Sequence, residues 1–186
     1  MIRIKAVDAQ NILEVCRLTI NRDGMGTAAA GHFCCNAISI AEAKYNPEMH
    51  PNAVYNNNIL IGFFMYHRAE NQADTAAICR FMIDDQFQHR GLGKKAFEYV
   101  LRGLKIQGVR KVILMIDDAD QIAKKMCLSF GFQSTGKIDN NKYYYELEEF
   151  CKEQDLEYLR NDDSQKRGIN EPPIVVNYFY HEEITK

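Results

Sequence analysis

A glycine-containing stretch in the middle of the chain has the composition of a phosphate-binding turn. It runs from Gln88 to Lys94 and follows an apolar run that ends at Ile83. Gly91 and Gly93 open a segment with helical spacing, so several backbone N–H groups should converge at the positive end of a helix dipole. Further positive charge comes from Arg90, Lys94 and Lys95. On its residues alone, the stretch is either a phosphate site or a plain tight turn.

Several other kinds of site are excluded because the chain lacks their sequence motifs. The chain contains neither the G-x-x-x-x-G-K-[ST] loop of P-loop nucleotidases nor the G-x-G-x-x-G fingerprint of dinucleotide-binding domains. Its six cysteines form no C-x-x-C pair and have no zinc-ligand spacing with the five histidines. We therefore expect no metal.

Charge and hydropathy limit the kinds of partner that we expect for this chain. The 186 residues carry a net charge of −2 with a pI near 6.2, which gives no reason to expect nucleic acid as a partner. Residues 88–137 hold ten Lys or Arg against four Asp or Glu, whereas residues 139–186 hold twelve acids against six bases. Neither a signal peptide nor a bilayer-length apolar run is present, so we expect no membrane partner and a cytoplasmic protein with reduced thiols.

The periodicity predicts alternating strands and helices around these residues. Apolar residues alternate or cluster as in strands over 2–7, 53–55, 59–66, 75–83, 109–116, 132–138 and 142–147. Helical spacing is found over 9–18, 36–45, from Gly91 to Gly108, and from Ala119 to Gly131. Asp8 is the expected N-cap of the first helix. The order predicts an α/β fold around a mixed sheet.

Two parts of the chain differ in composition. Residues 1–147 form the expected folded domain. Residues 148–186 form a C-terminal extension with an acidic helical stretch, a hydrophilic break, and the apolar run Ile174 to Tyr180. A strand of that composition would be an aggregation liability if exposed, so we expect it to add to a sheet edge, and a homodimer through it is a hypothesis.

Gln88-His89-Arg90-Gly91-Leu92-Gly93 matches the Q/R-x-x-G-x-G/A signature of the GNAT superfamily of N-acetyltransferases, between a strand and a helix as in that superfamily. Segments 36–45, 53–55, 61–63, 80–84 and 129–132 resemble bacterial spermine/spermidine or diamine acetyltransferases. The resemblance covers about residues 1–147.

This resemblance implies a splayed central sheet flanked by helices, with acetyl-CoA as co-substrate between two strands. The pantetheine arm would pair with the main chain of Phe81, Met82 and Ile83. The pyrophosphate would rest on amides of the turn and first helical residues: Gln88, His89, Arg90, Gly91, Leu92, Gly93 and Lys94. The basic excess of residues 88–137 independently suits a ligand with three phosphates.

For catalysis, the family pattern implies an oxyanion facing a backbone N–H, for which Met82 is the expected donor. The usual Asn-x-x-Ala-x-x-x-Tyr-x-x-x-Gly-Phe pattern has cysteine in place of its tyrosine acid, since the matching residues are Asp120, Ala123, Cys127, Gly131 and Phe132. Cys127 is either the proton donor or a core residue. Water or one of Tyr143, Tyr144 and Tyr145 could donate the proton instead.

Glu42 and Asp84 are the carboxylates inside the family-like segments, and a polycationic amine needs negative charge in its pocket. Glu42 is thus an expected substrate-binding residue, and Asp84 an expected base or substrate contact; the alternatives are a solvated Glu42 and an Asp84 that caps its loop. Tyr55 is expected to line the pocket or pack. Arg80 is expected to pair with an acid.

The functional hypothesis is direct transfer of an acetyl group from acetyl-CoA to a small amine, with a polyamine or diamine preferred. Two alternatives stay open. One is an acyl-CoA-binding sensor with little catalysis, and the other is acetylation of a protein N-terminus or lysine.

Overall fold

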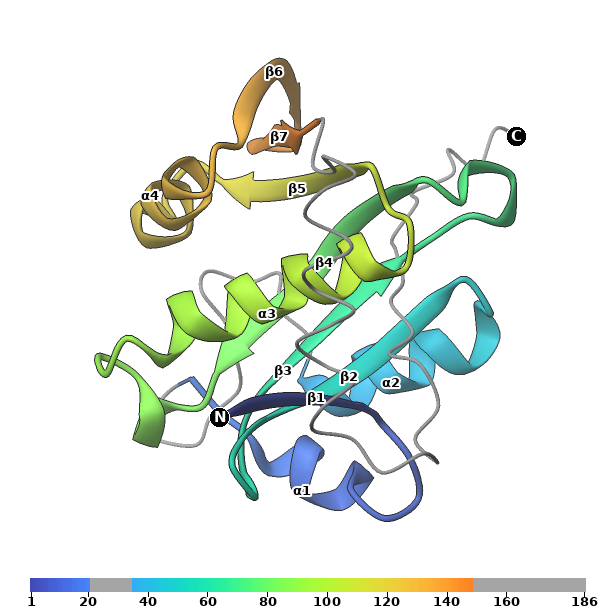
Figure 1. The fold of residues 1–186 in the computed structure, drawn as a ribbon, viewed down its shortest axis with the longest axis vertical. Helices are drawn as coiled ribbons and strands as arrows, with labels where there is room; N and C mark the ends of the chain where they lie inside the picture. Colours follow the sequence, from blue (N-terminus) through green and yellow to red (C-terminus); the bar gives the residue numbers. More distant parts are fainter. Residues whose placement is uncertain (21–34, 149–186) are drawn as a thin grey trace.

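The computed structural model describes residues 1–20 and 35–148. Its centre is one mixed seven-stranded sheet with the order β1-β2-β3-β4-β5-β7-β6 (Figure 1). The helices lie on both faces of this sheet, with α3 on one face and α1 and α2 on the other. The expected α/β class and mixed sheet are confirmed.

The strands and helices follow the predicted order. The strands are β1 (Ile2–Ala6), β2 (Met49–Asn56), β3 (Ile59–His67), β4 (Thr75–Ile83), β5 (Lys111–Asp117), β6 (Gln133–Asp139) and β7 (Lys142–Leu147). The α-helices are α1 (Ile12–Arg17), α2 (Asn36–Tyr45), α3 (Leu92–Ile106) and α4 (Gln121–Ser129). Two short 3₁₀ helices, η1 (Glu70–Gln72) and η2 (Asp85–Phe87), precede and follow β4. None of these helices is long and apolar enough to cross a membrane.

The first helix starts later than its sequence predicts. Asp8 does not cap it: the Asp8 carboxylate accepts hydrogen bonds from the N–H groups of Gln10 and Asn11, at 2.8 and 3.1 Å. The Asp8 carbonyl also accepts from Ile12 N–H at 3.0 Å, so this turn leads directly into α1, which begins at Ile12 with Asn11 as its N-cap residue. Strand β2 is longer than predicted because Met49–Asn52 pair with β3 although Pro51 interrupts their apolar pattern.

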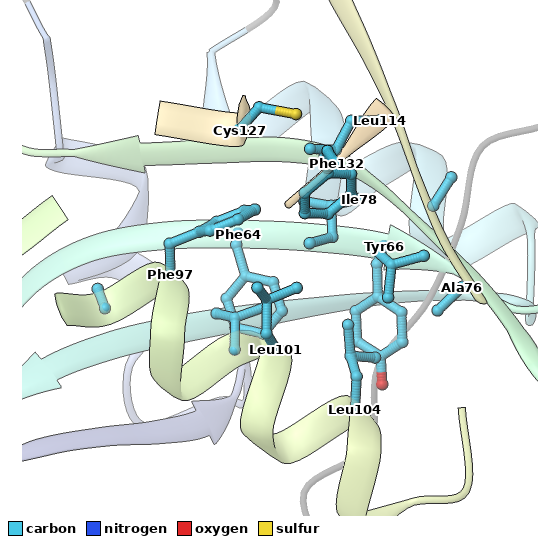
Figure 2. Close-up of a cluster of buried hydrophobic side chains, with 14 of the residues drawn as sticks. Phe64, Tyr66, Ala76, Ile78, Phe97, Leu101, Leu104, Leu114, Cys127 and Phe132 are labelled. Atoms are coloured by element: carbon cyan, nitrogen blue, oxygen red, sulfur yellow. The ribbon is translucent and has the colours of Figure 1, made fainter. Parts of the chain in front are cut away.

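Two hydrophobic clusters fix the two faces. Figure 2 shows the larger one, in which Phe97, Leu101 and Leu104 of α3 pack on Phe64 and Tyr66 of β3. The smaller cluster lies under α1 and α2, and includes Val15, Phe63, Met65 and Met82. Alternate residues of β3 and β4 therefore serve opposite layers, as strand geometry requires.

Strands β4 and β5 are parallel neighbours over only part of their length. They pair from Thr75↔Lys111 to Ile78↔Leu114, and no pair follows. Beyond this point β5 pairs on its other side with β7, as far as Asp117↔Lys142, while β4 continues along β3 to Ile83. The two central strands thus diverge, and their separated ends bound an opening whose apex is the Ile78–Leu114 pair. The predicted splay is confirmed.

Gly62 is required by the close approach of β3 to β4. A Cβ atom at Gly62 would lie closer than 3.0 Å to the carbonyl oxygen of Met82, a main-chain atom that cannot move alone. The divergent half of β4 is thereby held tightly against β3.

We predict that Gly62→Ala lowers the free energy of unfolding by about 1–3 kcal/mol, because the added methyl group must displace backbone. Chemical denaturation measures this change. Gly93→Ala is the matched control: its Cβ would meet the Ile83 side chain at an ordinary 3.6 Å, so its unfolding free energy should fall by less than about 0.5 kcal/mol or rise. Equal losses in the two variants would contradict the assigned contact.

Candidate functional site

The opening between β4 and β5 exposes main-chain hydrogen-bonding groups. Asp84 N–H donates to the Ile61 carbonyl at 2.9 Å, which fixes the register at the end of the β3–β4 ladder. Residues of an antiparallel strand alternate between facing and leaving their neighbour. The N–H and C=O groups of Phe81 and Ile83 therefore point away from β3, into the opening.

This register corrects the role expected for Met82. Met82 opposes Phe63 two residues before the Asp84–Ile61 hydrogen bond, so its N–H faces β3. Its side chain packs in the cluster under α1 and α2 and is 7% exposed. Neither group can reach an oxyanion in the opening. The amides suited to that role belong to Phe81 and Ile83. The alternating pattern of the strand could not show this, because it does not say which residues turn their N–H groups toward β3.

The turn after β4 is organised by Asp84. Its carboxylate accepts a hydrogen bond from Gln86 N–H at 3.1 Å, which caps the 3₁₀ helix η2, and another from Thr19 N–H at 3.0 Å. Asp85 N–H donates to the Thr19 carbonyl at 2.8 Å. The chain leaving α1 is thus fastened to the turn by two hydrogen bonds.

Asp84 is 4% exposed, and both its carboxylate oxygens accept backbone N–H groups. It is therefore placed as the cap of its loop, one of the two interpretations that the sequence left open. Because the side chain is buried and both of its oxygens accept from backbone donors, the structure favours the loop cap over a base or a substrate contact.

The start of α3 has amides that no side chain caps. Gly91 is the N-cap residue with a φ of 72°, and no side-chain hydrogen bond caps the helix. In contrast, Asp120 caps α4 by accepting from Ala123 N–H at 2.9 Å. His89 also has a positive φ, of 59°, which bends the chain just before Gly91. No described side chain caps the first amides of α3, as the predicted phosphate site requires, and phosphate binding there stays a prediction.

A hollow lies beside this helix start. It has a volume of about 630 Å³ and is lined by residues 85–90. Gln88 is turned inward, and its side-chain amide donates to the Ile83 carbonyl at 2.9 Å. His89, Arg90 and Lys94 are exposed, so their side chains are accessible to an anion. The structure brings the predicted coenzyme-binding residues together at one end of the opening.

Aromatic side chains close the α3 side of the opening. Phe97 of α3 lies 5.2 Å from Phe81 and 5.2 Å from Phe130 between ring centroids, and Lys94 Nζ lies 5.6 Å from the Phe130 ring. These contacts connect the start of α3 with the end of α4. The residue pattern did not single out Phe97 or Phe130, because an aromatic residue on a helical apolar stripe is typical of any core.

Cys127 lies inside the core. It is 1% exposed, and it belongs to the α3-side cluster together with Leu114 and Phe132 (Figure 2). Burial raises the pKa of its thiol to about 12. A thiol that weak is a poorer acid than an ordinary cysteine, so the structure favours the packing role over proton donation.

The three tyrosines of β7 differ in surroundings. Tyr145 is 8% exposed in the α3-side cluster, and Tyr144 lies under the Lys137 ammonium, 4.5 Å from the ring centroid. Tyr143 is half-buried and opposes Ile116, beyond the last β4–β5 pair. The Lys124 ammonium of α4 lies 4.7 Å from the centroid of the Tyr143 ring.

Tyr55 packs rather than faces the opening. It extends from β2 into the cluster under α1 and α2, with Lys5 Nζ 6.0 Å from its ring centroid. Burial raises the pKa of its phenol, with Glu14 contributing. In the sheet order, β3 and β4 separate β2 from the opening. The structure therefore favours packing for Tyr55.

Glu42 and Arg80 lie together on the α2 face. The Arg80 guanidinium is 3.7 Å from a Glu42 carboxylate oxygen, which confirms that Arg80 pairs with an acid. Arg80 is the second β4 residue beyond the apex of the opening. Sequence reasoning missed Ser39, which is one helical turn from Glu42 and 1% exposed. The feature that could have indicated Ser39 is its polar side chain on the side of α2 that faces the sheet.

Comparison with known proteins identifies the family of this fold and site. The model of the acetyltransferase (GNAT) family matches residues 22–132, well over half of the chain. The chain therefore belongs to the GNAT acetyltransferase family and is an acetyltransferase.

Similar proteins include acetyltransferases of related sequence and of related fold. The spermine/spermidine N(1)-acetyltransferase of Bacillus subtilis strain 168 is 27% identical over 146 residues, which cover 75% of this chain and 93% of that protein. Among solved structures, the PaiA N-acetyltransferase of Thermoplasma acidophilum, in complex with coenzyme A, has a TM-score of 0.57 at 15% identity and covers 80% of this chain and 99% of its own. The ribosomal-protein-S18-alanine N-acetyltransferase of Escherichia coli has a TM-score of 0.61 at 16% identity, covering 84% and 99%. These two structures support the fold.

We predict that Asp84→Ala lowers the free energy of unfolding by about 3 kcal/mol, because it leaves two amides without their acceptor at a buried position. Asp120→Ala is the matched control, since it removes a capping carboxylate at an exposed helix end and should cost about 1 kcal/mol. Urea denaturation of both variants gives the comparison. Similar losses would show that Asp84 is an ordinary exposed cap.

We predict that Cys127→Ala lowers the unfolding free energy by about 1–2 kcal/mol through a small cavity. Its kcat for acetyl transfer should stay within about threefold of wild type, because a buried thiol of raised pKa donates no proton. Steady-state kinetics below the melting temperature of the variant measures kcat. A loss of tenfold or more, with coenzyme affinity unchanged, would restore Cys127 as the acid.

Proposed function

We propose that this enzyme transfers the acetyl group of acetyl-CoA directly to a primary amine of a polyamine or diamine. The observation that carries the proposal is the opening between β4 and β5. There the main-chain groups of Phe81 and Ile83 face away from β3, next to the uncapped start of α3.

In the proposed complex, the pyrophosphate of acetyl-CoA rests on the amides from Gln88 to Lys94. Oriented amides, a helix dipole and the exposed Arg90 and Lys94 all favour a multiply charged anion there. The pantetheine arm then runs along β4, pairing with Phe81 and Ile83 as a missing strand would. This direction carries the thioester from the α3 end toward the apex of the opening.

The chemistry needs no covalent enzyme intermediate. The ammonium group of the acceptor first loses a proton to solvent. The free amine then attacks the thioester carbonyl carbon, and a C–N bond forms as negative charge develops on the carbonyl oxygen. An amide N–H of the opening stabilises that oxyanion. The carbonyl re-forms as the C–S bond breaks, and the new amide nitrogen loses its extra proton to solvent. The coenzyme thiolate takes up a proton, for which Tyr143 or water is the proposed donor.

The polyamine part of the proposal rests on similarity. The spermine/spermidine N(1)-acetyltransferase of Bacillus subtilis strain 168 acts, by its name, on spermine and spermidine, and the two sequences share 27% identity. Direct transfer is favoured because neither Asp84 nor Cys127 offers a free nucleophile or base in the opening. A cytoplasmic location is part of the proposal. Within the described part of the chain, Cys16, Cys35 and Cys127 form no disulfide, as a reducing compartment would keep them.

An acyl-CoA-binding sensor is the second candidate, and the burial of Cys127 at the usual position of the acid favours it. Turnover separates the two functions. Release of coenzyme A thiol should follow mixing of the enzyme with acetyl-CoA and spermidine, and should exceed the rate with a peptide N-terminus or a peptide lysine. Coenzyme binding by calorimetry without thiol release from any amine would support the sensor. Release with peptides alone would support protein acetylation.

We predict that Gly93→Leu weakens coenzyme A binding by tenfold or more, because the direction of its Cβ leads toward the Ile83 side chain at the edge of the opening. Calorimetry measures the Kd. Gly136→Ala is a glycine control far from the opening, on the outer strand β6, and should bind coenzyme A like the wild type. An unchanged Kd in a folded Gly93→Leu protein would place the coenzyme elsewhere.

The proposed homodimer involves residues 174–180, which lie outside the described residues, as does nearly all of the extension from residue 148. Deleting residues 161–186 tests that hypothesis by light scattering.

A further inference from the structure

Helix α2 packs Ile40 and Ala43 against the hydrophobic cluster under it, but its most deeply buried residues are polar. Its two fully buried residues are both polar, Asn36 and Ser39, at 4% and 1% exposure. Asn36 is satisfied, since its side-chain amide donates to the Val15 carbonyl at 2.9 Å. Glu42 continues the same face one turn beyond Ser39. A sequence that breaks the local packing rule in this way does so most often at a functional site.

Two acceptor-capable atoms on this face lack donors. One carboxylate oxygen of Glu42 is shielded from solvent, yet it has no hydrogen-bond partner among the described residues. The Ser39 hydroxyl oxygen is buried in the same way, again with no partner in residues 1–20 and 35–148. Buried polar atoms are almost always satisfied in native proteins, so two such atoms on one helix face suggest a missing ligand with donors.

Arg80 does not fill that requirement. Its guanidinium lies 3.7 Å from the same Glu42 oxygen, which is an ion-pair distance and longer than a hydrogen bond. Arg80 also donates to the Cys79 carbonyl at 3.1 Å, which holds it against its own strand. The pair therefore balances charge but leaves the carboxylate able to accept a closer cation.

The position of this pair fits the acceptor in the proposed reaction. If the coenzyme enters from the α3 side and its thioester reaches the apex, the amine must arrive from the other face of the sheet. Arg80 lies just beyond the apex, and its partner Glu42 belongs to α2 on that other face. A primary ammonium group carries positive charge and three N–H donors, which match a carboxylate and a hydroxyl.

We propose that Glu42, together with the Ser39 hydroxyl, binds the primary ammonium group of the acceptor, and that Arg80 is the resident cation with which the acceptor competes for Glu42. The inference rests on the proposed function and adds the residues that select a cationic amine. Arriving at Glu42, the ammonium group replaces Arg80 as the nearest cation. The two halves of this ion pair therefore have opposite effects on acceptor affinity.

The test compares variants of the full chain at saturating acetyl-CoA, with spermidine as the acceptor. Glu42→Gln should raise the KM for spermidine by about tenfold or more, because the ammonium loses its charged partner. The coenzyme Kd should not change. Ser39→Ala should raise KM less, by about threefold. Glu98→Gln, on the exposed side of α3, is the charge-matched control and should leave KM unchanged.

The direction in which Arg80→Gln changes the KM for spermidine is the decisive measurement. Removing the competing cation should lower the KM for spermidine by about two- to fivefold, whereas Arg80→Lys should resemble the wild type. A purely structural ion pair predicts instead that Glu42→Gln and Arg80→Gln raise KM together, and that result would overturn the inference. An unchanged KM in Glu42→Gln would overturn it as well. If Glu42→Gln does not fold, a raised KM in Ser39→Ala together with a lowered KM in Arg80→Gln supports the inference. A raised KM in both variants overturns it.

Calorimetric titration of spermidine into the enzyme–coenzyme A complex keeps the two proposals separate. Binding that weakens in Glu42→Gln without any turnover in the wild type would support this site and refute acetylation of spermidine. Turnover in the wild type with no weakening in Glu42→Gln would refute the site alone.

Discussion

The arrangement of this protein depends on two parallel strands that part halfway along their length. Backbone N–H and C=O groups are obligatory hydrogen-bonding groups, and a central strand normally satisfies them on both sides. Strand β4 satisfies one side through β3 but loses β5 after Ile78. The main-chain groups of Phe81 and Ile83 are left facing an opening inside the sheet. An extended ligand with amide groups could complete this edge, and the proposed coenzyme site depends on that property of the diverging strands.

Keeping such an opening requires rigid supports on both sides. On one side, Gly62 lets β3 approach the main chain of Met82 closely, and Asp84 fastens the following turn to the chain that leaves α1. On the other side, β7 pairs with β5 as far as Asp117. The aromatic cluster around Phe97 fills the space between α3 and α4. The opening is therefore a built feature of the fold, and the start of α3 is held at its wide end.

The two faces of the sheet offer different chemical groups. The α3 face offers uncapped amides and basic side chains, which suit an anionic coenzyme. The α2 face offers a carboxylate and a hydroxyl, both short of donors, which suit a cationic amine. In the proposed complex, opposite charges on opposite faces would let the two substrates meet at the apex of the opening without competing for one pocket.

Local signals in the sequence determined the strand and helix order, the glycine turn and the α/β class, and the match to a family motif implied the splayed sheet. Hydrophobic periodicity and glycine positions depend on neighbouring residues, so they can be read from the chain alone. The tertiary structure decided the roles of individual residues. Which amides of β4 face the opening depends on its pairing with β3, and this excluded Met82 in favour of Phe81 and Ile83. Asp84 became a loop cap because Thr19, 65 residues away in sequence, supplies a donor. Cys127 became a core residue because α4 packs it under the sheet, and Glu42 met Arg80 only through the packing of α2 on β4. Contacts between distant segments carry no local pattern, and for that reason they could not be predicted from spacing.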